Sequence, residues 1–234
     1  MDEASGLKIV SYNIRKAVGL DGRRDPERVQ RVLVDSGADI IVLQEADRRL
    51  GPRPSALPRH ALEAETPYRV AEVSVTDVSL GWHGNAILVR RELPILATAR
   101  LPLPGLEPRG AVRVDVAAPF GALAVIGAHL GLLRKWRRRQ MHALAEHLDR
   151  ADRPRAVIAG DFNEWSLRSG FEPLGPDFEV VAPGRSFHTS YPVASLDRFA
   201  HGTGIRLAET GVMRQGAARH ASDHLPVWAR LAQA

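Results

Sequence analysis

The sequence predicts an α/β protein with four layers, an α/β/β/α sandwich. Two packed, mainly antiparallel or mixed sheets would carry helices on their outer faces. The chain has 234 residues, enough to bury a sizeable core. A unit made of strand, helix and buried strand, with a polar residue at each strand end, occurs twice: 32 residues separate Asn13 from Glu45 and also His129 from Asp161. This repetition indicates a duplicated β-α-β unit. We therefore expect one domain over 1–234, with polar strand ends meeting at one rim.

The first unit begins with a strand over 7–14, "LKIVSYNI", which is rich in β-branched and aromatic residues. After an Asp-Gly turn, Pro26 opens a helix whose apolar residues recur at helical spacing until Gly37 ends it. The run "DIIVLQE" is then continuously apolar up to Glu45. Such continuity predicts a strand that is buried on both faces.

The second unit lies further along the chain. The run "FGALAVIGAHL" predicts a strand ending at His129, "RKWRRRQMHALAEHLDR" a helix, and "RAVIAGD" a strand ending at Asp161. Between the units, residues 48–67 look like a loop, or a loop with one short helix. The remaining expected strands lie at 68–79, 84–90 and 110–117, near 195–200, and after Pro226.

The composition limits which metal sites and nucleophiles the chain can contain. The chain is 44% hydrophobic and 25% charged, which is typical of a globular protein. It has no cysteine, which excludes disulfides, thiolate metal sites and cysteine nucleophiles. Any metal would be held by oxygen and imidazole, which favours hard cations such as Mg²⁺ or Mn²⁺. The acidic N-terminus and the lack of a long apolar run predict a cytoplasmic protein without a membrane span, and we expect a monomer.

The chain is basic, with a net charge of +5 and a pI of about 10.2. This balance suits a polyanionic partner such as a nucleic acid, a phosphorylated small molecule or an anionic lipid. A solvated, arginine-rich surface explains it equally well. The stretch "RKWRRRQ" at 134–140 has the same two interpretations, a phosphate-tracking surface or a solvated helix face.

Several strands end in polar residues that are hard to bury without a partner. Glu45 follows an apolar strand, where a salt bridge or a metal would satisfy it. In an extended segment Asp161 and Asn163 would face one site while Phe162 faces the core. An Asx-turn that closes the strand is the alternative.

Two histidines and their neighbours add proton-transfer chemistry. His224 lies next to Asp223 before Pro226, and Asp197 on another strand is available to hold it in one tautomer. His129 ends its strand and is either a satisfied core histidine or part of the site. Acids for a hard cation, imidazoles for proton transfer and amides for anion contacts suit hydrolysis of a phosphate ester.

Seven segments resemble known motifs, in order over nearly the whole chain: "SYNI", "LQE", "GNAILV", "GAHL", "GDFNEW", "SLDRF" and "SDHLPVWARL". They are similar to those of the endonuclease/exonuclease/phosphatase superfamily, which has the fold of pancreatic deoxyribonuclease. That superfamily includes abasic-site endonucleases, inositol polyphosphate 5-phosphatases, deadenylases and neutral sphingomyelinases. The resemblance implies a stand-alone bacterial hydrolase that uses Mg²⁺ or Mn²⁺.

The resemblance also implies roles for individual residues. The metal ligands would be Glu45, Asn13 and Asp223. The catalytic residues would be Asp161, which activates water, His224 supported by Asp197, His129 and Asn163. The phosphate contacts would be Asn13, Asn163 and Arg109. Two positions depart from the pattern of bacterial relatives, Arg15 and Arg198, and we expect them to alter substrate contacts.

These observations predict a metal-dependent phosphodiesterase or nuclease that attacks phosphorus in line with water. One alternative is a phosphatase or phospholipase-type enzyme acting on small or lipid phosphates. The other is a catalytically silent binding module on the same scaffold, which the complete set of catalytic positions disfavours. The sequence does not choose between these substrates or between one metal ion and two.

Overall fold

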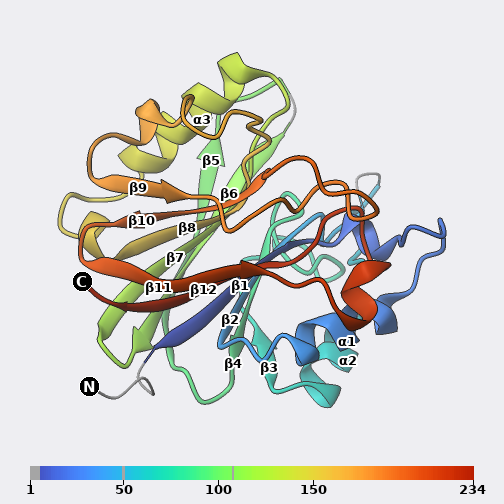
Figure 1. Cartoon of the computed structure of the whole chain (residues 1–234). Helices are drawn as coiled ribbons and strands as arrows, with labels where there is room; N and C mark the ends of the chain where they lie inside the picture. Colours follow the sequence, from blue (N-terminus) through green and yellow to red (C-terminus); the bar gives the residue numbers. More distant parts are fainter. Residues whose placement is uncertain (1–5, 49–50, 107) are drawn as a thin grey trace.

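The computed structural model describes residues 6–48, 51–106 and 108–234 of the chain. It contains two six-stranded sheets, drawn in Figure 1. The first has the order β11-β12-β1-β2-β4-β3, and its strands are β1 Leu7–Asn13, β2 Ile40–Gln44, β3 Tyr68–Val70, β4 Ala86–Arg90, β11 Ile205–Val212 and β12 Val227–Gln233. The second has the order β5-β6-β7-β8-β10-β9, and its strands are β5 Ile95–Leu103, β6 Arg109–Ala118, β7 Gly121–His129, β8 Ala156–Asp161, β9 Phe178–Val181 and β10 Asp197–Gly202.

Helices cover the outer faces of both sheets, which confirms the four-layer prediction (Figure 1). The helices are α1 Pro26–Asp35, α2 Arg59–Glu65 and α3 Arg134–Glu146, with short 3₁₀ turns at Arg15–Ala17, Arg153–Arg155, Glu172–Leu174 and Gly216–Arg219. Helix α1 starts where predicted, because the Asp25 side chain accepts a hydrogen bond from the Arg28 N–H and Pro26 occupies the first turn.

The strand β2 shows why a continuous apolar run is needed. Ile40 and Val42 face the core between the two sheets, whereas Ile41 and Leu43 face the helical layer. The two sheets approach closely at Gly127 of β7, where an added Cβ would lie 2.8 Å from a Val42 methyl carbon. Both faces of the central strands are therefore buried, as the sequence predicts.

Each sheet has one parallel pair at its centre, flanked by antiparallel pairs. β1 pairs with β2 in the first sheet and β7 pairs with β8 in the second, and each pair is joined through a helix. The two strand orders correspond position by position. The structure thus gives the two predicted β-α-β units the same topology.

Some predicted elements are wrong in extent, and others were missed. The strand expected over 68–79 is only Tyr68–Val70, after which the chain is irregular. Strands β5, β9 and β11 were not predicted. All three are edge strands that pair on one side only, and much of β5 is exposed, so they lack the apolar pattern of a buried strand. Helix α3 ends at Glu146, before the predicted segment does.

Within the described residues, no helix is long and apolar enough to cross a membrane. The acidic N-terminal stretch on which the expected location rests lies largely in residues 1–5, outside the described residues. The cytoplasmic location and the monomeric state stay predictions.

Candidate active site

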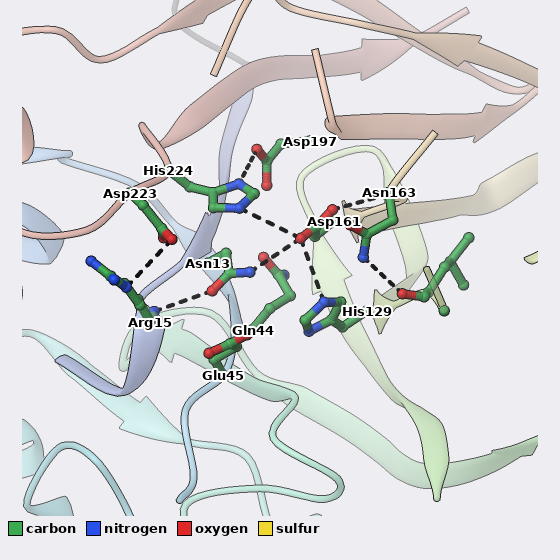
Figure 2. Close-up of polar contacts among 12 residues, drawn as sticks. Asn13, Arg15, Gln44, Glu45, His129, Asp161, Asn163, Asp197, Asp223 and His224 are labelled. Carbon is green, nitrogen blue, oxygen red and sulfur yellow. Dashed lines mark hydrogen bonds and ion pairs between the residues drawn. The ribbon is translucent and has the colours of Figure 1, made fainter. Parts of the chain in front are cut away.

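Polar residues from the ends of both central strand pairs meet at one point, and Asp161 is their centre (Figure 2). Its Oδ2 atom accepts a hydrogen bond from the Asn13 amide at 3.1 Å. The same oxygen lies 3.5 Å from His129 Nε2 and 3.7 Å from His224 Nε2. Asp161 itself is buried, with 2% of its surface exposed. One carboxylate oxygen thus faces an amide and two imidazoles.

The backbone around Asp161 brings it there. Gly160 precedes it, and a Cβ at this glycine would lie 1.8 Å from the Ala128 carbonyl oxygen. Only glycine therefore allows β8 to run this close to β7. The close pairing sets Asp161 directly opposite His129 in the parallel ladder.

Asn163 lies beside Asp161, but not in the extended geometry that we predicted. Its φ is +52°, in the left-handed region, and its N–H donates to Asp161 Oδ1 at 2.9 Å. The Asx-turn alternative is therefore the observed one. The Asn163 amide donates to the Leu130 carbonyl at 2.9 Å, and Phe162 is fully buried in the core, as expected.

The Asp197 carboxylate contacts the His224 imidazole and sets its orientation. His224 Nδ1 lies 2.8 Å from Asp197 Oδ2, and both side chains are buried. The Phe187 ring packs against the imidazole, with ring centres 4.9 Å apart. His224 is thus held in one orientation, with Nε2 toward Asp161, as the predicted carboxylate–imidazole arrangement requires.

Burial and charge shift both key pKa values. Burial alone would lower the pKa of His224, but the charge and hydrogen bond of Asp197, together with the charge of Asp161, raise it to about 10. Burial raises the pKa of Asp161 to about 6, although the positive charge of His224 opposes the shift. In the protein alone, His224 is therefore a cation at neutral pH, and Asp161 exchanges its proton near neutrality.

The two acids of the predicted metal set, Glu45 and Asp223, each pair with a cation from one turn. Lys16 forms an ion pair with Glu45, and Arg15 Nε lies 3.4 Å from Asp223 Oδ2. Both basic residues belong to the turn that follows β1, where the backbone is left-handed. Arg15 also donates its N–H to the Asn13 side-chain oxygen at 3.1 Å. Lys16 could not be assigned to the site from the sequence, since a single lysine in a loop looks like an ordinary surface residue.

The donor chemistry of these residues fits a hard divalent cation. Asn13, Glu45 and Asp223 offer oxygen ligands, and the Lys16 ammonium already places a positive charge on Glu45. The described residues contain no group of three or more acidic or imidazole side chains arranged as a metal cage. Mg²⁺ is commonly held by one or two carboxylates while it keeps several waters, so it needs no such cage.

A cavity of about 230 Å³ opens beside this cluster. Its lining includes Glu45, His129 and Arg109, and also Lys16, Asp47, Arg53, His83, Gly84 and Pro108. Arg109 donates to the His129 carbonyl at 3.4 Å. The predicted phosphate-side arginine therefore lines a cavity next to the cluster around Asp161.

The structure divides the basic stretch at 134–140, which begins helix α3. Arg137 is buried and forms a 2.9 Å ion pair with Glu164, the residue that follows Asn163. Arg138 pairs with Glu172 on the surface, and Arg139 lies over the Trp136 ring. The stretch is thus neither a uniform phosphate-binding surface nor only a solvated face.

Arg198, one of the two departures from the pattern of bacterial relatives, is a buried side chain, and its effect on substrate contacts stays a prediction. It is 1% exposed, lies over the Phe171 ring, and donates to the Glu164 and Ser166 carbonyls. Its role is to hold the loop after Asn163. Arg15 does contact the cluster, through Asp223 and Asn13.

A buried acid–imidazole cluster thus lies at the rim of two packed sheets, an arrangement suited to acid–base chemistry. The model of the Endonuclease/Exonuclease/phosphatase family matches residues 10–224. The uncharacterized protein YbhP of Escherichia coli (strain K12) is 31% identical over 253 residues, 96% of each chain. The chain therefore belongs to the Endonuclease/Exonuclease/phosphatase family, whose members are phosphoester hydrolases.

Two solved structures show the same fold at low identity. One is D. rerio TDP2 complexed with single strand DNA product, with a TM-score of 0.72, 18% identity, and coverage of 97% of this chain and 99% of that one. The other is the mannosyl-6-phosphatase Bt3783 of Bacteroides thetaiotaomicron, with a TM-score of 0.73, 17% identity, and coverage of 97% and 99%.

Proposed function

We propose that the chain is a Mg²⁺- or Mn²⁺-dependent phosphoester hydrolase, and specifically a phosphodiesterase of the endonuclease/exonuclease type. The observation that carries the proposal is the environment of Asp161 Oδ2, which faces the Asn13 amide and the two imidazoles of His129 and His224. This arrangement concentrates a proton acceptor and several donors at one point. It suits in-line attack of water on phosphorus.

Asp161 orients the attacking water and accepts its proton. Its pKa of about 6 lies close to neutral pH, which is the range where a general base works best. The Asn163 N–H holds the other carboxylate oxygen at 2.9 Å, so Oδ2 is the oxygen that faces the water. Asp161 therefore acts through position and proton affinity together.

His224 contributes a positive charge where the phosphate becomes more negative. Asp197 keeps the imidazole protonated and fixes its Nε2–H toward the site. A fixed cation in a buried site stabilises developing negative charge more strongly than one in water. His129 on the opposite side of Asp161 is placed to contact the leaving oxygen, and Arg109, Asn13 and Asn163 to contact phosphate oxygens.

Glu45, Asn13 and Asp223 would hold the divalent cation. When bound, the cation neutralises phosphate charge and stabilises the leaving oxygen. Lys16 and Arg15, which pair with two of these ligands, would then be released from Glu45 and Asp223 toward the substrate.

The basic balance of the chain and the DNA-product complex of TDP2 support a phosphodiester substrate. The mannosyl-6-phosphatase supports the alternative, a phosphatase or phospholipase-type hydrolase acting on small or lipid phosphates. Salt distinguishes them. A nucleic acid neutralised at many phosphates should lose affinity steeply with salt, whereas a small phosphate should not.

The test is an activity screen with Mg²⁺ or Mn²⁺ and with the Asp161→Ala protein as the blank. Substrates are plasmid DNA, RNA, abasic DNA, bis-p-nitrophenyl phosphate, inositol phosphates and phospholipids. We expect metal-dependent hydrolysis of diesters that the variant lacks. Hydrolysis of monoesters alone would favour the phosphatase, and no hydrolysis of any substrate would favour a silent binding module.

A further inference from the structure

Unusual backbone geometry gathers around the candidate active site. Among the described residues, seven that are not glycine have φ in the left-handed region: Arg15, Lys16, Ala17, Glu45, Arg53, His83 and Asn163. This conformation is unfavourable for residues with a Cβ, and it persists where the surrounding structure imposes it, often at functional sites. Five of the seven belong to the catalytic cluster or to the turn after β1. Arg53 and His83 have no role in the mechanism above.

Arg53 and His83 line the same cavity as Glu45 and His129. Arg53 Nη1 lies 3.0 Å from His83 Nδ1. Within the described residues, Arg53 Nε is buried and has no hydrogen-bond partner. Two residues from separate loops thus meet at the cavity, joined by a contact between a guanidinium and an imidazole.

The protonation of His83 matches this geometry. Burial, together with the positive charges of Arg53 and Arg109, lowers its pKa. A neutral imidazole accepts at Nδ1 from Arg53 and therefore carries its proton on Nε2. The pair then presents N–H donors of a guanidinium and an imidazole, which is a donor set that recognises anions.

The loop that carries His83 is well supported. The Trp82 and His83 rings lie 4.4 Å apart, and the Trp82 ring packs on Gly110, where an added Cβ would come within 2.2 Å of it. Trp82 and Asn85 exchange backbone hydrogen bonds at 2.9 and 3.0 Å. His83 is therefore held in place before any ligand arrives, which reduces the entropy cost of binding.

Two carboxylates also line the cavity, and both have partners. Glu45 pairs with Lys16. Asp47 is 2% exposed, its Oδ1 accepts the Leu80 N–H at 2.7 Å, and burial raises its pKa. The positive charge of Arg53 opposes this rise, and Arg53 and Arg109 add two guanidinium groups to the lining of the cavity.

We propose that Arg53 and His83 form a second anion-binding subsite, which takes a phosphate group next to the phosphate ester that is hydrolysed. The preferred substrates then carry at least two phosphates, as a nucleotide chain does. This inference rests on the proposed function, because the subsite lies beside the proposed catalytic cluster. A phosphorylated inositol headgroup offers the same chemistry, and the experiment distinguishes the two sources.

The test compares substrates that differ by one phosphate. The nucleotide series is the thymidine dinucleotide TpT with no terminal phosphate, with a 5′-phosphate and with a 3′-phosphate. The inositol series is glycerophosphoinositol with and without a 4-phosphate. We expect the wild type to hydrolyse one phosphorylated dinucleotide with a kcat/KM at least about ten-fold above that of TpT, mainly through a lower KM. The series in which the added phosphate raises kcat/KM more tells whether the subsite binds a nucleotide phosphate or an inositol phosphate.

Arg53→Ala should reduce this advantage to about two-fold or less, and Arg53→Lys, which keeps the charge without the planar fork, should retain part of it. The matched control is Arg206→Ala, which removes the same charge from an exposed position on β11. The ratio is measured within each protein, so a general loss of stability does not change it. An equal advantage in wild type and Arg53→Ala, or no advantage in either series, overturns the subsite.

A separate measurement keeps the two proposals apart. Calorimetric titration with inorganic phosphate, without divalent metal, does not need a working enzyme. Arg53→Ala should bind phosphate at least about ten-fold more weakly than Arg206→Ala. Weaker phosphate binding without any hydrolysis would support the subsite and overturn the proposed function. Hydrolysis of bis-p-nitrophenyl phosphate with unchanged phosphate binding would do the reverse.

Discussion

The two β-α-β units have the same topology but position their carboxylates differently. In the second unit, His129 pairs with Asp161 across the parallel ladder. In the first, Asn13 pairs with Gln44, so Glu45 lies one residue beyond the ladder and takes a left-handed backbone. Equal spacing in the sequence therefore hides a register that differs by one residue. Because successive strand residues face opposite sides of the sheet, this one-residue difference places Asp161 and Glu45 in different surroundings.

The difference gives two acids two environments. Asp161 is buried among hydrogen bonds, and its pKa is raised toward neutrality. Glu45 lines the cavity and pairs with Lys16. Gln44 occupies the buried ladder position of the first unit and bonds to Ser11 and the Val42 carbonyl. A duplicated scaffold can thus supply one carboxylate for proton transfer and another for a cation.

The largest expected effect comes from Asp161. Asp161→Asn removes the proton acceptor and should lower kcat by about 10³-fold or more, of the order of acid–base and electrostatic contributions combined. Added Mg²⁺ should not restore the rate, because this acid does not hold the metal in our proposal. Steady-state kinetics over a range of metal concentrations measures both points. Recovery at high metal concentration would mean that Asp161 and Glu45 share one role.

The helices of the two units are also anchored differently. Helix α1 has the Asp25 cap, whereas α3 has no side-chain cap and is tied by the buried Arg137–Glu164 ion pair. Arg137→Ala should therefore lower the unfolding free energy by about 3–5 kcal/mol, because it leaves Glu164 buried without its partner. Denaturant unfolding measures the change. The matched control is Arg138→Ala, whose pair with Glu172 is exposed and should leave stability unchanged within error.

The Asp197–His224 contact makes a prediction about pH in the metal-free protein. The pKa of His224 is raised from 6.5 to about 10, so this contact contributes stability that is complete below pH 6.5 and is lost as the pH rises through about 10. In Asp197→Asn the main raising charge is gone, and burial should bring the His224 pKa down toward or below 6.5. NMR titration of the imidazole in the presence of a chelator tests this. A His224 that titrates identically in both proteins would contradict the role of Asp197.

Glu45→Gln should weaken binding of the divalent cation more than it slows the chemical step. We expect apparent Mn²⁺ affinity to fall about ten-fold or more, since a charged oxygen ligand is replaced by a neutral one. Calorimetric titration with Mn²⁺ measures the affinity directly, and Asp161→Asn serves as the comparison. If Glu45→Gln and Asp161→Asn lose equal Mn²⁺ affinity, then Glu45 is not distinguished from Asp161 as a metal ligand.

The sequence could predict the central units because their strands are buried on both faces and end in polar residues. The contacts among Asp161, Asp197 and His224 follow from those strand ends. Strands β5, β9 and β11 could not be predicted, since partly exposed edge strands lack a clear pattern. Lys16, Arg53 and His83 were missed because isolated basic residues in loops look like surface, and only the fold brings them to one cavity.

The smallest expected effect is a change in Mn²⁺ affinity on substitution of Lys16. It is also the most direct test of the comparison between Glu45 and Asp161. The Lys16 ammonium pairs with Glu45, where it would compete with a bound cation, whereas Asp161 faces two imidazoles. Lys16→Ala should therefore increase Mn²⁺ affinity by a few-fold, while kcat falls because a cation near the substrate is lost. Lys135→Ala, an exposed lysine on α3, is the matched control. If Lys16→Ala binds Mn²⁺ no more tightly than this control, then Lys16 does not compete for Glu45, and the two carboxylates differ only in burial.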